Sequence, residues 1–204
     1  TLASIYAQSA RLYHQQLLLS YEADAHKLAS HYHFLAKDTL FYLYEQKMTA
    51  GAYILQNKKD SAEYILLHTI RLYNQYKFYD EALVSSTMLM HLYTEQPSRM
   101  PDLKKLVETF DEKSTLFDEN HDLPPSHRLF FFYKAKYHEE SNRLDSAEHY
   151  YRKMYHPNMS FTYQNSIYKG LLGVFSKRRQ RDSIAKYSQL YCAVNDSSIA
   201  SKSR

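Results

Sequence analysis

Histidine is the residue type of this chain best suited to bind a metal ion, and the sequence has 11 of them. Zinc sites on helices usually pair two His ligands four residues apart with a carboxylate between them, as in H-E-x-x-H. His26, His31 and His33 lie close together, but His31 and His33 are two residues apart and diverge around a helix. The tripeptide His-Glu-Glu at 138–140 lacks the second His. We therefore predict no metal site and interpret the histidines as solvated or hydrogen-bonded side chains.

The sequence contains no clear motif for nucleophilic or acid–base catalysis. The G-x-S-x-G elbow of serine hydrolases does not occur. The one cysteine, Cys192, excludes an internal disulfide and falls near the end of the last predicted helix, where it is expected to pack as a small apolar residue. The carboxylate pairs at 139–140 and 111–112 fall on Lys-rich helix faces and are interpreted as solvated ion pairs. The sequence therefore predicts no catalytic residues and no enzyme.

The three glycines limit the cofactors that the chain can bind. Gly51, Gly170 and Gly173 cannot form a Rossmann loop or a phosphate-cradling loop, because those loops need clustered glycines that let the backbone approach the phosphates. We therefore predict no cofactor.

The densest positive run contains Lys177, Arg178, Arg179 and Arg181, between the last two predicted helices. Cations at the C-terminal end of a helix interact favourably with its dipole, which is the simplest interpretation of the run. A phosphate or nucleic-acid contact is the alternative. The run contains no stacking aromatic residue, the helices carry no second basic stripe, and the net charge is only +4. Nucleic-acid binding by this segment is therefore not expected.

The elements that carry these residues are predicted to be helices throughout. Apolar residues recur at spacings of three and four, as in Leu144, Ala147, Tyr151 and Met154, and no segment shows sustained alternation. Only three Gly and five Pro occur in 204 residues, too few for the frequent turns of an all-β chain. No run of about 18 apolar residues occurs, so no membrane-spanning segment is predicted.

A repeated tetrapeptide indicates an internal repeat. Asp-Ser-Ala-Glu occurs at Asp60–Glu63 and at Asp145–Glu148, 85 residues apart, which is close to two periods of about 40 residues. We expect each Asp to be the N-cap of a helix and each Glu to reach back to it, as in a capping box. The Ala between them, Ala62 or Ala147, is expected to be buried where paired helices cross.

Breaks in the periodicity predict ten helices in a single helical-repeat domain that covers residues 1–204. The helices are expected near 2–19, 22–36, 38–56, 60–76, 79–96, 101–118, 126–141, 145–156, 161–177 and 181–193. They form five helix pairs, at 2–36, 38–76, 79–118, 126–156 and 161–193, followed by a tail or linker at 194–204.

The segment from Arg128 to Phe161 resembles the tetratricopeptide repeat. Ala135 and Ala147 occupy the two small positions of that repeat, and Pro157 falls near its terminal proline. Phe131 stands where the repeat usually has Trp, and a second, poorer match covers residues 43–76. The resemblance implies an all-α, right-handed α-α superhelix.

Four short segments resemble the repeat regions of Bacteroidetes proteins. They are Leu116–Asn120, Asp145–Lys153, Tyr168–Leu172 and Asp182–Tyr187. In those proteins the helical array precedes a transmembrane helix and a regulatory module. The resemblance therefore implies an extracytoplasmic, periplasmic sensing or docking domain of a membrane-anchored regulator, and a cytoplasmic location stays open.

The function that follows is binding of a protein or peptide, or of a second copy of the chain, on the surface lined by the first helices of the pairs. The alternatives are a small-ligand sensor or helical enzyme with a pocket between repeats, and a DNA-linked regulator whose effector part lies outside this segment. The repeat template assigns the partner-binding groove to eight residues that combine aromatic area with charge. They are Arg128, Phe132, Tyr133, Lys136, Glu139, Gln164, Tyr168 and Leu171.

Overall fold

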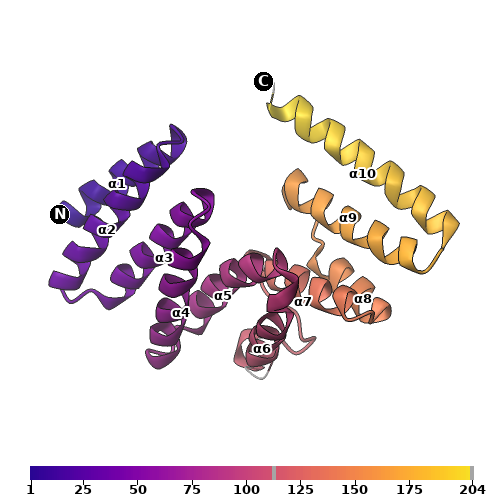
Figure 1. Ribbon diagram of the computed structural model, residues 1–204, viewed down its shortest axis with the longest axis horizontal. Helices are drawn as coiled ribbons and strands as arrows, with labels where there is room; N and C mark the ends of the chain where they lie inside the picture. The colour runs from indigo at the N-terminus through magenta and orange to yellow at the C-terminus, as the bar shows by residue number, and fades with distance from the viewer. Residues whose placement is uncertain (112–113, 203–204) are drawn as a thin grey trace. The chain divides into compact units, whose positions relative to one another are not determined.

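A computed structural model of the protein describes residues 1–111 and 114–202, and within them every long regular element is an α-helix (Figure 1). No strand occurs in these residues. The prediction of an all-α helical-repeat fold is therefore confirmed. The ten α-helices are α1 (Leu2–Gln15), α2 (Leu19–Leu35), α3 (Thr39–Leu55), α4 (Lys59–Gln75), α5 (Tyr79–Thr94), α6 (Met100–Asp111), α7 (Leu129–Glu140), α8 (Leu144–Met154), α9 (Phe161–Lys177) and α10 (Arg181–Lys202).

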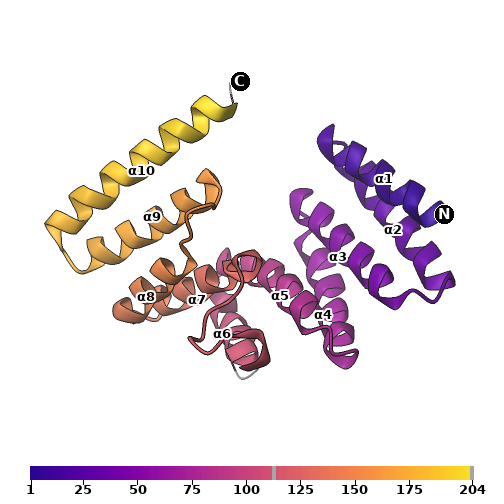
Figure 2. The same ribbon diagram turned by 180° about the vertical axis from the view of Figure 1, so that it is seen from behind.

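The chain divides into two compact units, an N-terminal unit at Thr1–Glu95 and a C-terminal unit at Gln96–Arg204. The N-terminal unit contains α1–α5, and each helix packs against the next. Figure 2, seen from behind, shows these five helices side by side in chain order. Helices α2, α3 and α4 each have 17 residues, and three residues join each one to the next helix.

One turn geometry recurs every 20 residues along the N-terminal unit. Leu17, Lys37, Asn57 and Lys77 all have left-handed backbone, with φ between 57° and 62°. Each turn is a Schellman motif: after α1, for example, the N–H of Leu17 donates to His14 O and the N–H of the next residue donates to Tyr13 O. Glycine usually occupies this position because a Cβ is strained there. The 20-residue repeat is therefore defined by the backbone hydrogen bonds of the turn, which form here although none of the four turn residues is glycine.

The turns overturn the predicted capping boxes. In each of these turns the residue after the left-handed position is the N-cap of the next helix. The N-cap of α4 is Lys58 and that of α8 is Arg143, and neither side chain forms a capping hydrogen bond. Asp60 and Asp145 therefore lie inside the first turn, where an acid interacts with the helix dipole without capping the helix. The two Glu residues of the motif bind other helices.

Small residues lie where the helices cross. Ala50, Ala62 and Ala82 in the N-terminal unit are fully buried, and so are Ala135 and Ala147 in the C-terminal unit. This confirms the predicted burial of Ala62 and Ala147. Close packing of helices requires such residues because a longer side chain would force the helix axes apart.

The C-terminal unit contains α6–α10, with shorter helices in its middle and an aromatic core. Phe110, Phe130 and Phe131 are buried together, and ring contacts join them. Helix α7 packs on α8, and α9 packs on α10. Gly170 of α9 lies against the ring of Tyr151, where a Cβ would lie 2.4 Å from the ring carbon Cζ. Glycine is required here by the close approach of α8 and α9.

Several helix ends differ from their predicted positions. The predicted helix 2–19 ends at Gln15, because Leu17 takes the left-handed conformation without a Gly or Pro to mark it. The predicted helix 101–118 is α6, which ends at Asp111, and residues 112–113 lie outside the described residues. Helix α10 continues past 193 to Lys202, through most of the segment predicted to be a tail, and residues 203–204 are not described.

Candidate functional site

The eight residues predicted to form a groove all lie in the C-terminal unit. The first of them, Arg128, binds other parts of the same unit. The guanidinium donates from Nε to Leu123 O at 3.1 Å and from Nη1 to Tyr155 O at 3.0 Å. Its Nη2 donates to Asp122 Oδ2 at 2.6 Å. Arg128 therefore ties the connection before α7 to the end of α8.

Glu139 and Lys136 belong to a polar cluster that joins three helices. Glu139 is only 7% exposed, and its Oε2 accepts a hydrogen bond from the Tyr151 hydroxyl at 2.7 Å. Lys136 Nζ lies 3.2 Å from the same oxygen, and Lys177 Nζ lies 3.2 Å from Oε1. Burial alone would raise the pKa of Glu139, but the Tyr151 hydrogen bond and the two lysines outweigh it and lower that pKa. The cluster locks α7, α8 and α9 together.

The other five predicted residues are buried or have structural contacts of their own. Tyr133 and Leu171 are buried, and Phe132 is half-buried with its ring edge-on to the rings of Tyr133 and Tyr151. Gln164 donates to Met159 O, and Tyr168 lies against the ring of Tyr187. The structure therefore brings Lys136 and Glu139 together and sets Phe132 against Tyr133. Their binding of a partner stays a prediction.

Two cations of the basic run hold helices together. Lys177 contacts Glu139, as described above, and Arg178 forms ion pairs with both Asp145 and Glu148 of α8. Burial alone would raise the pKa of Glu148, but the hydrogen bonds from Arg152 and Arg178 outweigh it, so that this pKa is lowered. The second copy of the repeated tetrapeptide thus supplies both carboxylates that bind Arg178, the C-cap residue of α9.

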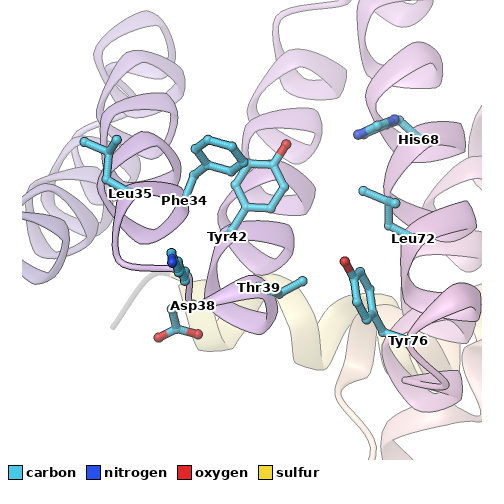
Figure 3. A pocket seen from close by; sticks show the side chains of 9 residues that line it. Phe34, Leu35, Asp38, Thr39, Tyr42, His68, Leu72 and Tyr76 are labelled. Carbon is cyan, nitrogen blue, oxygen red and sulfur yellow. The ribbon is translucent and has the colours of Figure 1, made fainter.

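An open groove in the N-terminal unit was not predicted. It has a volume of about 590 Å³ and lies between the C-terminal ends of α2 and α4, above the start of α3 (Figure 3). We call it the α2–α4 groove. Its lining residues are Phe34, Leu35, Lys37, Asp38, Thr39, Tyr42, His68, Leu72 and Tyr76.

Aromatic and apolar side chains form the walls of the α2–α4 groove. Figure 3 shows Phe34 and Tyr42 together on one side and His68, Leu72 and Tyr76 in a column along α4 on the other. The rings of Phe34 and Tyr42 are 5.5 Å apart. Phe34 is 63% exposed, Leu35 61% and Tyr76 48%. These side chains offer contact area that no part of the described chain covers.

Polar groups at the mouth of the α2–α4 groove are partly held in place. The carboxylate of Asp38 caps α3 through the N–H of Phe41, at 3.3 Å. His68 Nδ1 lies 3.3 Å from Arg71 Nη2. Apolar walls with a few fixed polar groups are the usual composition of a site that binds a peptide or small molecule.

A second pocket, of about 520 Å³, lies in the C-terminal unit and is basic and aromatic. We call it the α7–α8 pocket, after the helices of Lys134 and Lys153. The Lys134 ammonium lies 4.4 Å from the centre of the Tyr150 ring and is buried. Lys153 Nζ lies 5.1 Å from the centre of the Phe131 ring and donates to His121 O. The remaining lining residues are Phe117, Asn120 and His149.

No helix among the described residues is long and apolar enough to cross a membrane. The same residues contain no group of three or more His, Cys, Asp or Glu side chains placed to hold a metal ion. The one buried histidine of the described residues has a carboxylate partner: His26 Nδ1 lies 2.6 Å from Glu45 Oε2 across the α2–α3 contact. No family model matches the sequence, and no curated protein matches it either.

Sequence reasoning missed the α2–α4 groove because its residues are ordinary apolar positions of a helical stripe. One signal was present. Phe34 and Leu35 are two large apolar residues that directly precede a turn. The exposure of both side chains depends on how α4 packs, and a local sequence pattern does not predict that packing.

Proposed function

We propose that this chain is a docking module that binds an apolar segment of a partner protein in the α2–α4 groove. The observation that supports this most directly is the exposure of Phe34, Leu35 and Tyr76 around a concave surface of about 590 Å³. Contiguous exposed apolar area that is rimmed by polar residues is typical of interaction sites. Aromatic side chains in such a depression are the residues that most often carry binding energy.

The chemistry of the groove supports a partner of one kind. The walls suit one or two large apolar side chains, and the rim carries both signs of charge in Lys37 and Asp38. A short helix or extended segment with a Leu or Phe anchor and flanking polar residues fits this surface. We propose no catalytic role for the chain.

The wider role rests on the resemblance of the sequence to tetratricopeptide repeats and to the repeat regions of Bacteroidetes regulators. On that basis we propose that the module is the docking or sensing domain of a larger, membrane-associated regulatory protein, on its extracytoplasmic side. The groove predicted from the repeat template in the C-terminal unit is a further proposed contact area. Its half-buried members are Arg128, Phe132, Lys136, Gln164 and Tyr168.

The test is a selection of short random peptides displayed against the full chain, followed by titration of the selected peptides. Phe34→Ala with Tyr76→Ala removes the groove walls and should weaken binding more than tenfold. The matched control is Tyr64→Ala with Leu67→Ala, two exposed α4 residues that do not line the groove. Equal binding by both double variants, or no selected peptide at all, would overturn the proposal.

The α7–α8 pocket supports a second candidate function, which is recognition of a small anionic ligand. Two lysines and an aromatic ring suit a planar ring that carries a phosphate or carboxylate. Adenosine monophosphate is a suitable probe, with inorganic phosphate as the control. A rise in melting temperature that requires the ring and is lost in Lys134→Met would support this function. No rise with either compound would count against it.

A further inference from the structure

Helix α1 has an apolar stripe on its outer side. Leu2, Ile5 and Leu12 are 53%, 57% and 58% exposed, and with Ser9 they follow the 3-4-3 spacing of one helix face. The opposite side of α1 is used for packing, because Ala3 and Ala10 are buried and α1 contacts α2.

The repeat register identifies the equivalent positions in α3 and α5. The left-handed turn residues recur every 20 residues, so a helix pair spans 40, and Leu17 corresponds to Asn57. Adding 40 and 80 to Ile5 gives Glu45 and Ser85, and adding them to Leu12 gives Ala52 and Leu92. All four counterparts are at most 2% exposed. At Ile5, Ser9 and Leu12 the stripe thus occupies positions that α3 and α5 bury, whereas Tyr42, the counterpart of Leu2 in α3, is half-buried.

Contacts of α3 and α5 show what covers that face. In α3, Glu45 binds His26 of α2 and Gln56 donates to Leu19 O at the start of α2, at 2.7 Å. In α5, the Tyr93 hydroxyl donates to Glu63 of α4 at 2.9 Å. In both cases the face is covered by the helix that precedes it along the chain.

The sequence of α1 keeps the residue types that make these contacts. Tyr13 corresponds to Tyr53 and Tyr93, and Tyr53 lies under the ammonium of Lys27 from α2, at 5.2 Å from its ring centre. Gln16 corresponds to Gln56 and is exposed. Helix α1 therefore has both the apolar stripe and the polar ends of a surface that receives a helix.

We infer that the outer face of α1 binds one further amphipathic helix, antiparallel to α1, in the way that α2 lies on α3 and α4 lies on α5. The occupant has the chemistry of α2 and α4. It presents small and apolar residues to Ile5 and Leu12 and a polar group to the Tyr13 hydroxyl. Its first backbone carbonyl accepts from Gln16. This interface is separate from the α2–α4 groove and does not depend on the proposed function.

The test grafts residues 59–81 of this chain directly before Leu2, in place of Thr1. This reproduces the α4–α5 spacing, because Ala82 corresponds to Leu2. The grafted helix should raise the thermal midpoint of the full chain by about 5 °C and should itself resist proteolysis.

The control variant is the grafted chain with Ile5→Lys and Leu12→Lys, which should melt like the ungrafted chain. The same substitutions in the ungrafted chain should change nothing, because both side chains are more than half exposed there. No rise on grafting, or an equal rise in the control variant, would overturn the inference. Concentration-dependent dimerisation of the ungrafted chain that these substitutions abolish would overturn it in favour of a second copy.

Discussion

Both units are built from packed helices, but their surfaces differ. Among the described residues, the N-terminal unit has 15 exposed large apolar side chains and the C-terminal unit has three. Residues 1–95 carry 8 Lys and Arg against 9 Asp and Glu, a net charge of −1, and residues 96–204 carry 18 against 13, a net of +5. A surface with exposed apolar side chains suits docking, and a basic surface suits electrostatic contacts.

The interiors differ in a related way. The N-terminal unit is regular, with 20-residue steps. The C-terminal unit has shorter helices, held by aromatic rings and by ion pairs around Glu139 and Arg178. A regular array of this kind extends by adding similar helices. Of the described residues, those in the N-terminal unit also carry most of the exposed large apolar side chains.

The largest effect should come from a charge at a helix crossing. Ala147→Glu and Ala62→Glu each overpack a fully buried position and bury a carboxylate, so each should destabilise its unit by about 4 kcal/mol. Denaturant unfolding followed by circular dichroism measures this. If the two units unfold separately, each variant lowers only one transition. A variant that unfolds like the parent would show that its crossing is absent.

Acid should weaken the C-terminal unit through Glu139. The folded-state pKa of this group is lowered from the usual 4.5, so its contribution is present above that value and is lost as pH falls through the lower folded pKa. Glu139→Gln should cost about 2 kcal/mol at pH 7 and should flatten the pH dependence of stability below pH 4.5. The check is thermal unfolding from pH 7 to 3, with Glu140→Gln as the exposed control.

The two units should respond in opposite ways to replacement of a helical glycine. Gly170→Ala drives a Cβ into the Tyr151 ring and should cost about 2 kcal/mol. The nearest atom to a Cβ at Gly51 is Met88 Cε at 3.3 Å, the end of a flexible side chain. Gly51→Ala should therefore be neutral or stabilise by about 0.5 kcal/mol. A similar loss of stability in both variants, measured by urea unfolding, would remove this contrast.

Helical periodicity made much of the fold predictable. The spacing of apolar residues around Ala147 and Ala62 predicted that both are buried, because the apolar stripe of a helix marks the face that packs against other helices. The C-terminal end of α1 and the capping of α4 were not predictable, because Leu17 and Asn57 adopt left-handed turns without a glycine to mark them. The α2–α4 groove was not predictable either, since exposure of Phe34 depends on helices distant in sequence.

Effects of about 1 kcal/mol or less should come from the turns that set the 20-residue step. Leu17 has φ 57° and is 77% exposed, so its strain is not offset by burial. Leu17→Gly should stabilise the N-terminal unit by about 1 kcal/mol. Asn57→Gly should gain less, because Asn tolerates the left-handed region better than Leu does.

The matched control for Leu17→Gly is Gln8→Gly, an exposed position inside α1, which should lose about 1 kcal/mol. Both changes remove a side chain from the surface, so only the backbone conformation at the substituted position distinguishes them. Urea unfolding of the three variants should therefore rank Leu17→Gly above Asn57→Gly and Gln8→Gly last. If Leu17→Gly destabilised as much as Gln8→Gly, residue 17 would lie within a continuous helix, and the 20-residue register that relates α1 to α3 and α5 would be wrong.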